Sequence, residues 1–73
     1  MKPERKELED CIVALVFPSL INMTDYLSTV PEFFKQLESG ICSDLKKPNP
    51  SDSTEIWLMI NSHDLAKIEH LLK

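Results

Sequence analysis

Four side chains in this sequence could take part in metal or thiol chemistry, namely Cys11, Cys42, His63 and His70. A metal site needs ligands that converge on one ion, and none of these four is paired with another at chelating spacing. His63 and His70 lie seven positions apart, so on a helix they would stand about 10 Å apart along the axis. We therefore expect no metal site and no cofactor, and we interpret both histidines as solvated side chains on a helix surface.

A catalytic cysteine needs a neighbouring base or positive charge that stabilises its thiolate. Cys11 follows a run of acidic residues and Cys42 lies two positions before Asp44, so both thiols have neighbours of the wrong charge. An isoleucine also adjoins each cysteine. This setting predicts free thiols packed in the core, in a reducing compartment. A thiol-dependent activity at Cys42 is an alternative hypothesis.

Other catalytic patterns are missing from the sequence. The single glycine, Gly40, cannot form a phosphate-binding loop, and no serine has the setting of a nucleophile elbow. The acidic residues recur at the spacing of ordinary helix surfaces. We predict that the protein is not an enzyme and has no catalytic residues and no small-molecule substrate.

The net charge of the protein limits the kinds of molecule that it is expected to bind. Twelve acidic residues against eight basic ones give a net charge of -4, which repels nucleic acid and anionic lipid. The longest unbroken apolar run, residues 11–17, is far shorter than the ~20 residues that span a bilayer. No secretory signal is visible. These features predict a cytoplasmic protein that does not bind membranes, and they disfavour binding to nucleic acid.

Apolar residues recur every three or four positions along most of the chain, which is typical of amphipathic helices. Prolines at positions 18 and 31 and the glycine at position 40 mark the expected boundaries. The expected elements are a helix from Pro3 to Phe17, a short helical turn capped by Thr24 and reaching Val30, a new helix from Pro31 that closes at Gly40, a loop at 43–53, and a helix from His63 to Leu72.

Residues 53–60 decide the fold class. Asp52 and Glu55 resemble a capping box, which predicts a helix. However, the apolar run from Ile56 to Ile60 also fits a short buried strand. We predict a mainly α fold, a single small domain over residues 1–73 that forms a bundle of three to four short helices. The alternative is an α+β fold with short strands near 11–17 and 55–60.

Large side chains stand at adjacent positions at 33–34 and 57–59, and adjacent residues cannot all point into one thin core. Trp, Phe and Met commonly anchor protein interfaces. The predicted partner-binding residues are Met23, Phe34, Trp57 and Met59. The competing interpretation is that every large residue fills the core of the chain itself.

The predicted function is a non-catalytic protein–protein interaction module. It would act as a small acidic regulator, chaperone or inhibitor that binds another protein, or itself as a homo-oligomer such as a dimer. A chain of 73 residues gains little net stability from its own core, which favours a partner. The alternative is a small helix-turn-helix transcriptional regulator, because three short helices fit within this length.

Overall fold

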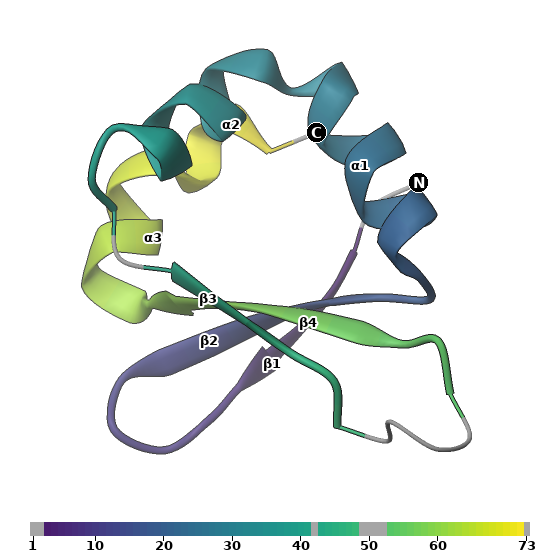
Figure 1. Ribbon diagram of the computed structural model, residues 1–73. Coiled ribbons are helices and arrows are strands. Elements are labelled where there is room, and N and C mark those ends of the chain that lie inside the picture. Colours follow the sequence, from purple (N-terminus) through teal and green to yellow (C-terminus); the bar gives the residue numbers. More distant parts are fainter. Residues whose placement is uncertain (1–2, 42, 49–52, 73) are drawn as a thin grey trace.

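The computed structural model describes residues 3–41, 43–48 and 53–72. Over these residues the chain forms one antiparallel four-stranded sheet with three α-helices and a short 3-10 helix (Figure 1). In chain order the elements are β1 (Glu4–Glu7), β2 (Ile12–Phe17), α1 (Leu20–Thr29), α2 (Pro31–Glu38), β3 (Ser43–Lys46), β4 (Ile56–Asn61), α3 (Ser62–Ile68) and the 3-10 helix η1 (Glu69–Leu71). The predicted mainly α bundle is therefore wrong. The architecture is α+β, with strands β2 and β4 at the two places named in the alternative.

The predicted helix over Pro3–Phe17 is wrong because the chain reverses in its middle. Asp10 and Cys11 both have positive φ angles, 57° and 60°, and such angles are typical of a tight turn between antiparallel strands. The amide of Leu8 donates to the carbonyl of Ile12 at 2.7 Å and closes this hairpin. The first charged residues of that predicted helix, Glu4–Glu7, instead form the edge strand β1, where charge protects an open edge.

Strand β2 forms because its apolar residues can pair on both sides. It lies between β1 and β4 in the strand order β1-β2-β4-β3, and Ala14 lies opposite Lys6 on one neighbour and Met59 on the other. Its valines and isoleucine suit a pleated, buried surface. Tertiary pairing thus overrides the local helical spacing.

Two helix boundaries agree with the sequence prediction. Pro31 is the first residue of α2 and follows α1 after the single residue Val30, which confirms a new helix at this proline. Gly40, just beyond the C-cap Ser39, has a φ angle of +129°, so this glycine does end the helix. The expected start at Thr24 is wrong, because Ser19 caps α1 and accepts a hydrogen bond from the amide of Asn22.

The last third of the chain differs from the prediction in two places. Residues 56–61 form strand β4, so a helix at 53–60 is wrong. The first part of the expected loop, Ser43–Lys46, is the edge strand β3, whereas residues 49–52 lie outside the described part. The C-terminal helix is confirmed over most of its length, although Asn61 rather than Ser62 caps it by accepting from the amide of His63 at 2.8 Å.

The core lies between the sheet and the helices, which all cover the same side of the sheet (Figure 1). Alternate residues of β2 and β4 point into this core, as the period of a strand requires. The core residues are Val13, Leu15, Phe17, Met23, Tyr26, Leu27, Val30, Phe33, Ile56, Leu58, Ile60, Leu65 and Ile68. No element of the described residues covers the other side of the sheet (Figure 1).

Candidate functional site

The side of the sheet away from the helices is the most distinctive surface of the described residues, and we call it the open face. The strand registers and the alternation of side chains define its members. They are Glu4, Lys6, Ile12, Ala14, Val16, Asp44, Lys46, Trp57, Met59 and Asn61. This face combines an apolar centre with charged edges.

Trp57 and Met59 form the centre of the open face and are both half-buried. The indole Nε1–H of Trp57 donates to Oε1 of Glu55 at 2.8 Å. The ammonium of Lys6 lies over the same ring, 5.1 Å from its centre, which is within the range of a cation–π contact. These two contacts hold the indole in a fixed position.

The contact between Lys6 and Trp57 also explains an unusual burial pattern. Lys6 is on β1 and Trp57 is on β4, and strand β2 lies between them. The two side chains therefore meet above β2. Ala14 and Val16 point to the open face yet are only 0% and 7% exposed, because the side chains of neighbouring strands cover them where no helix does.

Acidic and basic residues alternate at both edges of the open face. The strand registers place them in two rows across the sheet: Glu4, Val16, Trp57, Lys46 in the first row, and Lys6, Ala14, Met59, Asp44 in the second. Each row has an acid at one end and a base at the other, and the two rows run in opposite senses. The four edge residues are exposed.

The structure brings together two of the four predicted partner-binding residues. Trp57 and Met59 are neighbours on the same side of β4. Phe34 is 44% exposed, but it lies on α2, on the helical side of the molecule. Met23 is 6% exposed and packs in the core, so it is not available to a partner.

Sequence reasoning missed Lys6, Ile12 and the small residues of β2 as parts of this surface. The signal that would have found them is the alternation of β4, whose residues are buried and half-buried in turn. Once residues 56–61 are read as a strand, Trp57 and Met59 must share a side. The residues of β2 then follow from the pairing of the two strands.

The thiols and imidazoles form no catalytic or metal centre in the described part of the chain. Cys11 is a free, exposed thiol in the hairpin turn, so the prediction that it packs in the core is wrong. Cys42, with the hypothesis of a thiol activity there, lies outside the described residues. Within residues 3–41, 43–48 and 53–72, no three His, Cys, Asp or Glu side chains gather where they could hold a metal ion.

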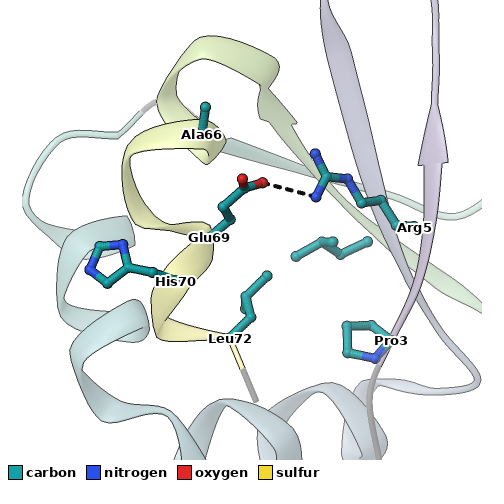
Figure 2. Close-up of a pocket in the computed structure, with 7 residues that line it drawn as sticks. Pro3, Arg5, Ala66, Glu69, His70 and Leu72 are labelled. Carbon is teal, nitrogen blue, oxygen red and sulfur yellow. Dashed lines mark hydrogen bonds and ion pairs between the residues drawn. The ribbon is translucent and has the colours of Figure 1, made fainter.

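A pocket of about 620 Å³ opens between β1 and the C-terminal helices (Figure 2). Apolar side chains make up much of its lining, and Arg5 donates to Glu69 across it at 3.0 Å. This ion pair leaves no unbalanced charge to attract a ligand. His70 points away from the pair, toward the other side of η1 (Figure 2). The pocket therefore offers no nucleophile beside a base.

The helices give the helix-turn-helix alternative no support. That motif joins two helices through a turn of about three to four residues, whereas only Val30 separates α1 from α2. Strands β3 and β4 separate α2 from α3 along the chain. Among the described helices, none is therefore placed as the second, recognition helix of such a motif.

Among the helices of the described residues, none combines the length and the apolar character needed to cross a membrane. Comparison with known proteins found no matching family model, no matching curated protein and no matching solved structure. The open face is thus the candidate site on the strength of its own geometry.

Proposed function

We propose that the chain is a non-catalytic protein-binding module whose binding surface is the open face. One observation carries this proposal: Trp57 and Met59, both half-buried, stand at the centre of a sheet face that no described element covers. Sheets in small domains usually bury one face and expose a polar one. An apolar centre on the second face favours a partner there.

The chemistry of the open face resembles the anatomy of protein interfaces. Such interfaces have an apolar core that contains aromatic and methionine side chains, surrounded by a polar rim. Here the centre is Trp57 and Met59, and the rim is the charged edges of β1 and β3. Because Glu55 and Lys6 already fix the indole, binding costs little additional side-chain entropy.

In this role the module regulates, chaperones or inhibits the protein it binds and catalyses no reaction itself. The exposed free thiol of Cys11 supports a reducing compartment such as the cytoplasm, because exposed thiols oxidise outside it.

Site-specific photo-crosslinking in cells of the source organism tests this function. One variant carries benzoylphenylalanine in place of Trp57, and the control carries it in place of Ile21, which is 72% exposed on α1. We expect protein adducts, identified by mass spectrometry, from position 57 and not from position 21. Adding Met59→Glu to the first variant should abolish them.

Circular dichroism of each variant would establish that it is folded. Adducts that form equally from position 21, or adducts from position 57 that persist with Met59→Glu, would contradict a binding role for the open face. A folded variant that forms no adduct from position 57 would contradict it as well.

A further inference from the structure

We infer that the open face binds a second copy of this chain, with the two sheets packed face to face about a two-fold axis. The axis runs parallel to the strands and lies between β2 and β4. This inference rests on the proposed function and names the partner of that same surface. The charges and the side-chain sizes along the two rows of the open face carry it.

The charge pattern of the open face complements itself under this rotation. The rotation places β1 of one copy over β3 of the other, and β2 over β4, without a shift along the strands. The strand registers then set Glu4 opposite the partner's Lys46, and Lys6 opposite the partner's Asp44. All the facing charges at the edges have opposite sign, which favours encounter in this register.

The sizes of the central side chains are also complementary. The rotation sets Trp57 opposite the partner's Val16 and Met59 opposite the partner's Ala14, so a large side chain faces a smaller one in each row. Because side chains of their own sheet already cover Ala14 and Val16, the partner's Trp57 and Met59 would pack onto that cover, at the ~10 Å spacing of packed sheets. The indole above β2 would then be covered by the partner's β4.

A two-fold axis perpendicular to the strands fits the open face less well. It also pairs opposite charges, because it sets Glu4 against the partner's Lys6. However, it places Trp57 against the partner's Met59 and leaves Val16 against the partner's Ala14. Under this axis the two largest side chains of the open face would meet each other directly, so packing favours the axis parallel to the strands.

A second copy also fits this face better than a protein whose surface charges are all of one sign. Two acidic and two basic residues occupy its edges, so the rim has no net charge to attract a strongly acidic or basic protein. The sheet measures roughly 20 Å by 19 Å from strand geometry. Two copies would bury on the order of 800 Å² in total, which is typical of a weak dimer with a Kd in the micromolar range or above.

Charge reversal at the edges tests this arrangement. Glu4→Lys and Lys46→Glu each turn an attractive pair of the homodimer into a repulsive one, twice by symmetry. In a mixture of the two variants, every facing pair of the heterodimer is again attractive. By sedimentation equilibrium at low salt, we expect each variant alone to dimerise at least about fivefold more weakly than the natural chain. The equimolar mixture should recover dimerisation.

The controls separate the possible failures. Glu4 and Lys46 are exposed, so both variants should fold, which circular dichroism would check. If each variant is weakened but the mixture does not recover, the axis parallel to the strands is wrong. If the natural chain remains monomeric at about 1 mM, the second copy is not the partner.

The crosslinking experiment at position 57 then decides whether the proposed function survives. An adduct with a different protein would retain the function and overturn this inference, whereas no adduct would overturn both. A dimer that persists with Met59→Glu and dissociates with Phe34→Glu would place the interface on the helical side. It would overturn this inference and leave the proposed function to the crosslinking result. The supporting result is a dimer that Met59→Glu dissociates and that the mixed charge variants restore.

Discussion

The ammonium of Lys6 lies 5.1 Å from the centre of the Trp57 ring, although their strands, β1 and β4, are not neighbours in the sheet. The contact passes above β2 and connects β1, the charged edge strand, to Trp57 in the middle of the open face. It also keeps the small residues of β2 out of water. The open face is therefore an organised surface in a single copy of the chain.

Removing this contact should loosen the open face without unfolding the protein. Lys6→Gln loses the charge over the indole, and we expect the free energy of unfolding to fall by about 0.5–1 kcal/mol. The fluorescence of Trp57, the single tryptophan, should shift to longer wavelength as water reaches the ring. Lys35→Gln on α2 is the matched control. Equal effects of the two substitutions would show that the contact contributes nothing specific.

The adjacent residues Phe33 and Phe34 should respond very differently to the same substitution. Phe33 is fully buried, whereas Phe34 is 44% exposed. Phe33→Leu leaves a cavity in the core and should lower the free energy of unfolding by about 1–2 kcal/mol. Phe34→Leu should change it by less than about 0.5 kcal/mol. Urea titrations of both variants measure this, and similar losses would mean that α2 is rotated relative to the structure described.

A glycine at position 11 should stabilise the protein. Cys11 has a φ angle of 60°, which costs a residue with a Cβ roughly 1–2 kcal/mol, while a glycine adds about 0.5–1 kcal/mol of entropy to the unfolded chain. We expect Cys11→Gly to raise the free energy of unfolding by about 0.5–1 kcal/mol. Cys11→Ser keeps the strain and should leave it nearly unchanged. A destabilised glycine variant would contradict the turn geometry.

The helix boundaries that depend on one residue could be predicted from the sequence. Pro31 fixes its own φ angle and suits a first turn, and Gly40 tolerates the positive φ angle that follows α2. These are local effects, so they act in the same way whatever the rest of the chain does.

The sheet could not be predicted in the same way, because its stability comes from pairing between distant residues. Every residue of β1 is exposed and all four are charged, so this strand has no apolar pattern of its own. The sequence of Ile56–Asn61 is compatible with a helix and with a strand. The strand forms because β2 is available to pair with it. The open face was therefore visible in the sequence only as two large residues, Trp57 and Met59.

Burial of the open face on association can be followed directly through Trp57. Acrylamide quenching of its fluorescence should be measured from about 1 µM to about 1 mM protein, a range that spans a weak dimer. We predict that quenching decreases and that the emission shifts to shorter wavelength as the concentration rises, in step with the mass from sedimentation. A mass that doubles while quenching and emission stay constant would show that the copies meet elsewhere and would contradict this account.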